Sequence, residues 1–403
     1  MKKSNIMKLG ILCLMIKLLA ITASEAQEKE TSFSIYGHAM MDMGYNFNQI
    51  HSDWSDVVRP SQLPSYDNEY APDGNMYYGV RQTRFGVESM VPNELGDLRI
   101  LFEFELFGTG ADAGQTTFRL RHAYGELGQF GAGQYFSPFM DIDVFPNTIE
   151  YWGPSGMVFF RNIQFRWMPI KGKDKLTFAL EKPGASADGG VYVDKIQLRD
   201  VHFRFPAPDF SAEYRKGYDW GYVELASMLR YIEWDDIDPN DGIDLSDNAI
   251  GWGLNLSSNL KLSSSTTGRF QVVYGKGIQN YMNDGGTDIG IEYNLSDPTK
   301  PLKGVVQPVL GLVAFVDHEW NEQFSSSAGF SILDTNHANA QAPDSYAKGQ
   351  YALANLLYYP TKNVMAGIEL QYGRRENFSD DFSSEIMKIQ FSFKYSFSSK
   401  MHF

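Results

Sequence analysis

The stretch MKIQFSFKYSFSSKMHF, residues 387–403, ends the chain and alternates apolar with polar side chains almost without a break. Apolar residues hold one parity, interrupted by Ser399, and polar residues hold the other. Successive side chains of a β-strand point to opposite faces, so this segment has one aromatic, apolar face and one polar face. A strand of a soluble sheet usually spans about 5–6 residues. The greater length here predicts a strand that crosses a membrane as part of a β-barrel.

Alternating segments recur along the whole chain, and no helical stripe of useful length interrupts them. We therefore expect one all-β domain, a transmembrane antiparallel β-barrel of about sixteen strands. The alternating segment near 289–293 is assigned to an outer loop, because including it makes the strand count odd. An eighteen-stranded barrel that also recruits 198–205 is the alternative. The predicted strands lie near residues 33–43, 78–90, 98–106, 116–127, 129–136, 158–168, 174–182, 208–216, 220–234, 248–260, 267–276, 304–318, 324–332, 349–359, 363–373 and 387–403.

The predicted connectors alternate between short and long. Short turns on the periplasmic rim and long loops outside the cell are typical of bacterial outer-membrane barrels. Both chain termini would then be periplasmic. The long connectors span 46–77, 137–157, 183–207, 235–247, 277–303, 333–348 and 374–385.

The N-terminus has the pattern of a secretory signal peptide. Two lysines precede an apolar run, and small residues follow it at the positions that a signal peptidase reads. We expect cleavage before Gln27, which divides the chain into a signal peptide at 1–26 and an outer-membrane barrel at 27–403. Cys13 is the only cysteine, so the mature chain would contain no disulfide. Removing the signal peptide changes the formal net charge from −14 to about −17, which argues against nucleic acid as a partner.

Five separated stretches are distinctive in combination. They are FRLRHAYGE at 118–126, GAGQ at 131–134 followed by FMD at 139–141, GWGLNL at 251–256, YGRREN at 372–377 and IQFSFKYSF at 389–397. Together they resemble the DcaP-like porin family over nearly the whole mature chain. The resemblance implies a homotrimeric outer-membrane channel for small hydrophilic solutes, often anions or dicarboxylates. Some family members carry an N-terminal periplasmic coiled-coil extension, and few residues separate Gln27 from the first predicted strand here.

Charged residues on the predicted strands alternate with apolar ones. An arginine that faced lipid at the bilayer midplane would cost roughly 2–4 kcal/mol, so the charged parity should face the lumen. On the fourth strand, Arg119 and Arg121 would point inward and Phe118, Leu120 and Tyr124 outward. The predicted pore-lining residues on strands are Arg84, Arg99, Glu103, Glu105, Arg119, Arg121, Arg166 and Arg269.

These residues predict a pore wall that is partly basic. The alternative is that the arginines pair with Glu88, Glu103 and Glu105 and satisfy one another. Both interpretations can hold together, because ladders of paired charges also shape the field across a pore.

The connector at 137–157 is too apolar for an ordinary exposed loop. We expect it to fold inward and to narrow the pore, with Asp141 and Glu150 facing the arginine wall across an eyelet. Asp143 is a third acidic candidate for the pore lining. The alternative is an external lid that packs on neighbouring loops.

Residues 233–247 carry seven carboxylates and no basic side chain. Asp236, Asp238 and Asn240 have the spacing of a calcium loop, but Asp241 stands where that loop needs glycine. We therefore expect a solvated outer loop, bridged loosely to lipopolysaccharide by divalent cations, and no specific metal site.

Sequence signals for an enzyme are weak. No zinc-protease, nucleophile-elbow, phosphate-loop or dinucleotide motif occurs, and His38, His122 and His318 lie singly on predicted strands. We expect a porin that needs no cofactor and catalyses no reaction. The alternatives are a barrel hydrolase similar to an outer-membrane phospholipase and a plugged barrel that anchors the envelope.

The C-terminal aromatic residues suggest a second role for the last strand. Assembly into the membrane requires a signal that is readable before a barrel exists. We expect Phe393, Tyr395, Phe397 and Phe403 to form that signal for the barrel assembly machinery. The other expected partners are outer-membrane lipid and lipopolysaccharide.

Overall fold

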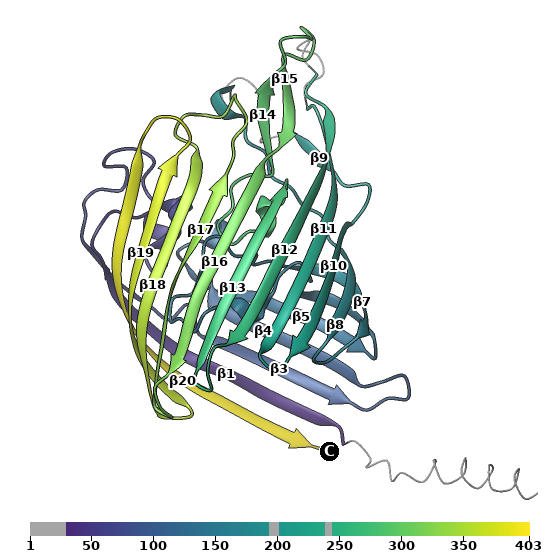
Figure 1. Ribbon diagram of the computed structural model, residues 1–403, viewed down its shortest axis with the longest axis vertical. Coiled ribbons are helices and arrows are strands. Elements are labelled where there is room, and N and C mark those ends of the chain that lie inside the picture. The colour runs from purple at the N-terminus through teal and green to yellow at the C-terminus, as the bar shows by residue number, and fades with distance from the viewer. Residues whose placement is uncertain (1–29, 193–200, 238–243) are drawn as a thin grey trace, which may run out of the picture.

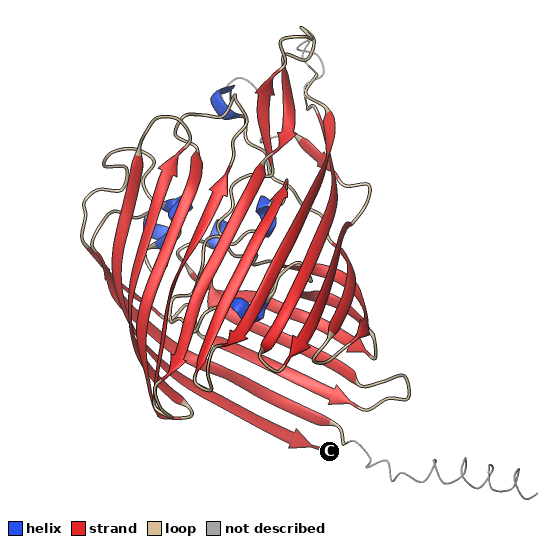
Figure 2. Ribbon diagram, viewed as in Figure 1, coloured by secondary structure: helices blue, strands red, loops and turns tan. Residues whose placement is uncertain are grey.

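Nearly all regular structure of the chain is β (Figure 2). The computed structural model describes residues 30–192, 201–237 and 244–403. In this part of the chain sixteen strands form a closed antiparallel barrel, and the last strand pairs with the first. They are β1 (Ser32–Asn46), β3 (Arg84–Val91), β4 (Leu98–Phe107), β5 (Thr116–Leu127), β6 (Phe130–Phe136), β7 (Arg161–Ile170), β8 (Lys175–Glu181), β10 (Asp209–Tyr218), β11 (Gly221–Asp235), β12 (Asp247–Lys261), β13 (Thr266–Lys276), β16 (Pro308–Glu319), β17 (Phe324–Thr335), β18 (Tyr346–Thr361), β19 (Val364–Asn377) and β20 (Ser383–His402).

Four further strands are short. β2 (Asn75–Gly79) and β9 (His202–Arg204) pair with the outer ends of β1 and β11, beyond the points where β3 and β10 stop pairing with them. β14 (Ile289–Tyr293) and β15 (Leu302–Val306) form a separate two-stranded sheet that projects above the barrel (Figure 1). The sixteen-stranded prediction and the assignment of 289–293 to a loop are therefore confirmed. The eighteen-stranded alternative is wrong, because β9 is three residues long and only caps β11.

The last strand shows why the alternating sequence forms a barrel wall. Lys388 and Gln390 are fully buried on the inner face of β20, whereas Phe393, Tyr395 and Phe397 are 39%, 58% and 46% exposed on the outer face. Barrel closure places β20 between β1 and β19, so the backbone groups from Lys388 to Tyr395 have ladder partners on both sides, which a hydrocarbon environment requires. The β20 ladder with β1 runs through fifteen residue pairs.

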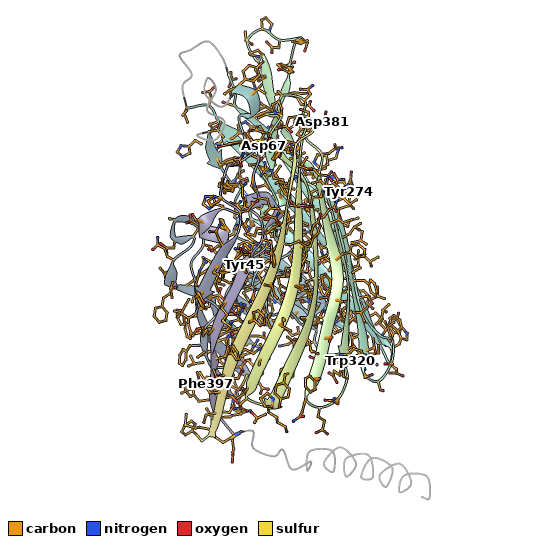
Figure 3. All side chains as sticks on the ribbon, turned by 90° about the vertical axis from the view of Figure 1, so that its left-hand side faces the viewer. Tyr45, Asp67, Tyr274, Trp320, Asp381 and Phe397 are labelled. Atoms are coloured by element: carbon orange, nitrogen blue, oxygen red, sulfur yellow. The ribbon has the colours of Figure 1, made fainter. Side chains whose placement is uncertain are left out.

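Short turns and long loops lie at opposite ends of the barrel. Trp320, in the turn between β16 and β17, and Phe397 lie at one end, and Asp67 and Asp381 of long loops lie at the other (Figure 3). This confirms the predicted alternation of connector lengths. Among the described residues, no helix is long and apolar enough to cross a membrane. The predicted signal peptide and its cleavage site at 1–26 lie outside the described residues.

A β-bulge in β5 changes which residues face the pore. Glu103 and Phe104 of β4 are consecutive, but their partners on β5 are His122 and Leu120, so Arg121 is an extra residue. The bulge lets Arg121 and His122 both point inward, and it reverses the alternation beyond them. Tyr124 is 2% exposed, so the prediction that it faces lipid is wrong.

The lumen has a packed interior of its own. The chain leaves the wall after β6 and runs inside the barrel until β7 begins. The loop at 137–157 therefore folds inward, as predicted. Phe139 and Val144 of this loop are completely buried against the inner faces of the opposite wall. The first long loop also folds inward, with Val57 and Val58 fully buried.

We predict that deleting Phe403 lowers the amount of protein in the outer membrane while leaving the purified chain able to refold in detergent. The Phe403 side chain is 74% exposed, and its N–H donates a single hydrogen bond to the carbonyl oxygen of Thr31 (2.8 Å). The deletion therefore removes about 0.5–1.5 kcal/mol of folding free energy but an entire recognition element. Surface labelling of cells and heat-modifiability on gels measure the two effects.

Phe403→Tyr is the matched control, because it keeps an aromatic terminus. Normal surface levels after the deletion would contradict the assembly role, and failure to refold in detergent would make Phe403 structural instead.

Candidate functional site

A cavity of about 550 Å³ lies inside the barrel, between the wall built by β20, β1, β3 and β5 and the inward loop at 137–160. We call it the eyelet cavity. Its loop side is largely apolar or aromatic and includes Ile142, Phe145, Tyr151 and Trp152. Its basic lining residues are Arg84, Arg119, Arg121, Arg161 and Lys394.

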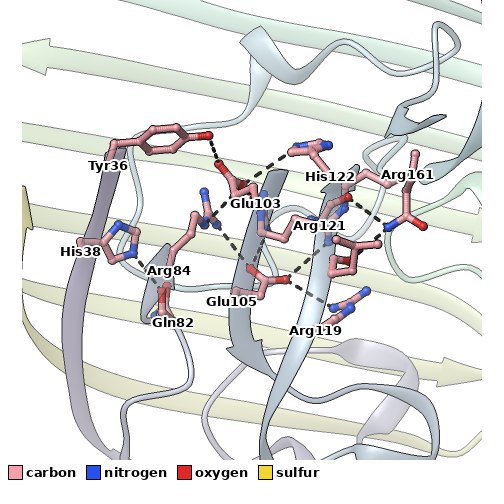
Figure 4. Close-up of polar contacts among 12 residues, drawn as sticks. Tyr36, His38, Gln82, Arg84, Glu103, Glu105, Arg119, Arg121, His122 and Arg161 are labelled. Atoms are coloured by element: carbon pink, nitrogen blue, oxygen red, sulfur yellow. Dashed lines mark hydrogen bonds and ion pairs between the residues drawn. The ribbon is translucent and has the colours of Figure 1, made fainter. Parts of the chain in front are cut away.

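Four arginines surround the carboxylate of Glu105, whose side chain is fully buried (Figure 4). Arg121 donates to it at 2.5 Å, whereas the nearest nitrogens of Arg84, Arg161 and Arg119 lie 3.5, 3.6 and 3.7 Å away. One buried negative charge therefore holds four positive ones together. At these distances only Arg121 makes a strong hydrogen bond, and the other three guanidinium groups retain donor capacity.

Glu103 forms the second carboxylate of this cluster. It accepts a hydrogen bond from Arg121 Nε (2.5 Å) and another from the hydroxyl of Tyr36 (2.9 Å). His122 Nε2 lies 4.0 Å from it. The bulge in β5 makes this possible, because it points two consecutive side chains, Arg121 and His122, toward Glu103.

The inward loop contacts this cluster through Tyr151 and the first long loop through Trp152. The Tyr151 hydroxyl donates to Glu105, and its ring stacks on Phe107 with centroids 3.7 Å apart and planes within 6°. The Arg59 guanidinium lies 4.0 Å from the Trp152 ring centroid and 4.2 Å from that of Trp54. Cation–π contacts of this kind are strongest away from water, so they hold the inward loop against the first long loop, to which Arg59 and Trp54 belong.

The other side of the loop is anchored to the far wall. Thr148 Oγ1 donates to both oxygens of Glu369 (2.8 and 2.7 Å), and the backbone N–H of Ile149 donates to the same carboxylate (3.1 Å). Glu150 accepts from the backbone N–H of Val58 and from the hydroxyl of Tyr351, both at 3.1 Å. Glu150 thus joins the two inward loops at the edge of the eyelet cavity. Burial raises the pKa of Glu150 to about 7.

The two aspartates of the loop lie elsewhere. Asp141 accepts hydrogen bonds from Arg215 (2.7 Å), Tyr222 (2.7 Å) and Ser257 (2.6 Å) on the wall against which the loop packs. The same arginine donates to Asp143 at 2.5 Å. Burial opposes ionisation of Asp143, but the Arg215 hydrogen bond and charge hold its pKa below the usual range. The prediction that Asp141 faces the arginine wall is therefore wrong.

The remaining predicted strand residues do not line the eyelet cavity. Arg269 pairs with Asp317 and lines a separate cavity of about 730 Å³ on the Asp143 side of the loop. Arg99 pairs with Glu88 at 2.5 Å. Arg166 donates to Gln164 (Nε, 3.1 Å) and lies over the rings of Tyr124 and Tyr135.

Two basic residues that line the eyelet cavity were not predicted from the sequence. Lys394 lies on the polar parity of the last strand, so the alternation itself could have identified it. Arg161 occupies the first position of β7 at the end of the inward loop. Its parity on β7 is outward, so the alternation does not predict a lumenal side chain. The side chain turns inward to Glu105 because Arg161 lies where the wall ends.

The described residues contain no group of three or more His, Cys, Asp or Glu that could hold a metal ion. Asp238, Asn240 and Asp241 of the calcium-like spacing lie outside the described residues, and Asp236 lies just before them.

Comparisons with known proteins agree with this geometry. A sequence model of the DcaP outer membrane protein family matches residues 19–397. The outer membrane channel DcaP of Acinetobacter baumannii has a similar structure, with 19% sequence identity, a TM-score of 0.75 and coverage of 92% of this chain and 99% of that chain. No curated protein sequence matches the chain.

Two further outer-membrane proteins share the fold at lower similarity. An anion-selective porin from Comamonas acidovorans has 10% identity and a TM-score of 0.56 over 91% of this chain and 100% of that chain. The trimer form of OmpT from Vibrio cholerae has 9% identity and a TM-score of 0.51 over 92% and 100%. The family match, the closed barrel and the lumenal cavity lead to one conclusion. The chain is a porin of the Gram-negative outer membrane and belongs to the DcaP outer membrane protein family.

Proposed function

We propose that this porin favours small anionic solutes, and dicarboxylates in particular. The proposal rests on the charges at the eyelet cavity. Four arginines and Lys394 line it, and the nearby carboxylates are those of Glu103, Glu105 and Glu150. All three carboxylates already accept hydrogen bonds from the protein. The cavity therefore has an excess of positive charge and of free donors.

The free donors are suited to carboxylates. The Arg119 and Arg161 nitrogens lie 3.7 and 3.6 Å from Glu105, beyond ordinary hydrogen-bond distance, so their planar donor pairs remain available. A guanidinium binds a carboxylate through two parallel hydrogen bonds. The opposite side, with Phe145 and Trp152, would contact the apolar part of a solute. An anion with an apolar centre and two carboxylates matches both sides.

Transport through such a site needs only a concentration gradient. The fixed polar groups of the lumen replace part of the solute's hydration, and the charged wall raises the local anion concentration. Trp152 and Tyr151 keep the passage narrow, so every solute that passes comes close to the arginines.

We also propose that the protein is a homotrimer and not an enzyme, and that the barrel assembly machinery and lipopolysaccharide are among its partners. The family resemblance and the trimer form of the OmpT structure support the assembly state. A hydrolase or a plugged anchoring barrel would give no stepwise current in a planar bilayer, and a hydrolase would release fatty acid from phospholipid.

The anion preference predicts that Arg84→Gln combined with Arg119→Gln shifts the reversal potential in a KCl gradient toward cations. One unit charge at about 4 Å contributes about 1 kcal/mol even in bulk water, so removing two charges should change the permeability ratio roughly thirtyfold. Arg121 is a poorer target, because its loss would leave two buried carboxylates without their main partner.

Lys216→Gln is the matched control, since Lys216 pairs with Asp174 near the turn between β10 and β11 and does not line the eyelet cavity. A reversal potential that moves equally in the control, or does not move in the double variant, would refute the preference. Repeating the measurement with succinate as the anion tests the dicarboxylate part separately.

The inward loop predicts a second outcome for pore size. Trp152→Ala should raise the single-channel conductance, because the indole lines the eyelet cavity. Removing a large aromatic side chain from a packed site also costs about 3–5 kcal/mol of stability, so the melting temperature should fall.

Trp320→Ala is the matched control, because Trp320 is 62% exposed in a turn. A conductance that is unchanged in Trp152→Ala would show that another constriction limits the current.

A further inference from the structure

The barrel wall has a gap beside β5. β5 and β6 pair only through Ala123–Leu127 and Phe130–Gln134, so residues 116–122 of β5 have no neighbouring strand on that side among the described residues. The gap exists because β6 ends at Phe136, where the chain turns into the lumen. One side chain bridges it partly: Gln134 Nε2 donates to the carbonyl oxygens of Leu120 and Arg121, both at 3.1 Å.

A hollow of about 300 Å³ lies next to this gap, and we call it the wall hollow. It has room for about ten water molecules at their liquid volume. The hollow borders the outer face of the barrel at Ile163, which is 54% exposed and has the outward parity of Phe165 and Trp167. Its lining residues are Gln134, Phe160, Arg161, Asn162, Ile163, Lys182, Pro183, Gly184 and Tyr281.

Two cations line the wall hollow, and none of its lining residues is a carboxylate. The Arg161 side chain is only 7% exposed, yet its Nη1 has no hydrogen-bond partner, and its other terminal nitrogen lies 3.6 Å from Glu105. Lys182 makes no ion pair with any described residue, and its backbone N–H donates to the carbonyl of Ile163 (2.8 Å), which fixes it at the rim. A buried guanidinium with an unused nitrogen is costly unless an acceptor, from water or from a ligand, satisfies it.

We propose that the wall hollow binds a phosphate-class oxyanion, through Arg161 and Lys182. Arginine and lysine are the side chains that bind phosphate most strongly, the first through its planar fork and the second as a point charge. The same chemistry has two sources here, the phosphate of a membrane lipid headgroup and free inorganic phosphate. The position at the outer face of the barrel and the exposed Ile163 and Phe165 there suit a headgroup with acyl chains.

An oxyanion bound in the wall hollow would change the charge at the eyelet cavity. Phe160 and Arg161 line both the wall hollow and the eyelet cavity, so they are the boundary between the two. An oxyanion on the outer side of Arg161 would neutralise part of the charge that Arg161 contributes to the eyelet. The site itself does not depend on the anion preference proposed above, because Lys182 is absent from the eyelet lining.

The test measures ligand retention by the full-length protein in native mass spectrometry. Wild type, Lys182→Gln, Lys182→Arg and the control Lys303→Gln are compared in detergent alone, with phosphatidic acid, and with inorganic phosphate. Lys303 is a partly exposed lysine of the outer hairpin that pairs with Glu292 (3.4 Å). Loss of one charge-assisted hydrogen bond should weaken retention in Lys182→Gln roughly tenfold. Lys182→Arg should restore it.

Each outcome decides the proposal. Tighter retention of phosphatidic acid by wild type and Lys303→Gln than by Lys182→Gln supports a lipid headgroup site, and the same pattern with inorganic phosphate supports a free-anion site. Equal retention by all four proteins in both arms would overturn the proposal and leave Lys182 a solvated cation. The reversal potential of Lys182→Gln in lipid without phosphatidic acid should equal that of wild type, which separates failure here from failure of the pore proposal.

Discussion

The buried carboxylate of Glu105 is the contact on which the rest of the pore depends. It faces four arginines and accepts a hydrogen bond from the hydroxyl of Tyr151, so it joins the charged wall to the inward loop. Four guanidinium groups at these separations would repel one another without it. Removing one partner of a buried ion pair typically costs 3–5 kcal/mol, because the other charge stays buried. The field of the eyelet and the position of its narrowing loop are therefore properties of one cluster.

The lumen is narrow because this barrel packs a core on its inside. Phe139, Val144 and Val57 are as buried as core residues of a soluble protein, although they lie within a membrane barrel. The polar inner wall accommodates them by hydrogen bonding the loop backbone, as Glu369 does with Ile149. The same inward turn shortens the wall beside β5, since a chain that enters the lumen cannot also continue the sheet. Constriction and wall gap thus have a single cause.

Alternation in the sequence predicted the barrel because lipid on one side and water on the other impose it on every residue of a strand. Phe397 and Lys388 lie on the faces that their parity requires. The position of Tyr124 could not be predicted this way, because one extra residue at Arg121 reverses the parity and is specified by pairing with β4. The partners of the loop residues could not be predicted from parity either. Asp141 pairs with Arg215, which is far from it in the sequence, and only the path of the loop brings the two together.

The net charge of −14 illustrates why composition does not determine what a pore selects. Carboxylates in solvated loops, such as Asp297, are screened within about 8–10 Å at physiological ionic strength. A passing solute meets instead the few groups at the narrowest point, where side chains rather than bulk water surround it. In the proposed function, a carboxylate that already accepts hydrogen bonds, like Glu105, holds the arginines in place, and an arginine with free donors, like Arg119, attracts the solute. A negative net charge is therefore compatible with a basic eyelet, because the selectivity of a pore depends on the charges that are left unpaired in its lumen.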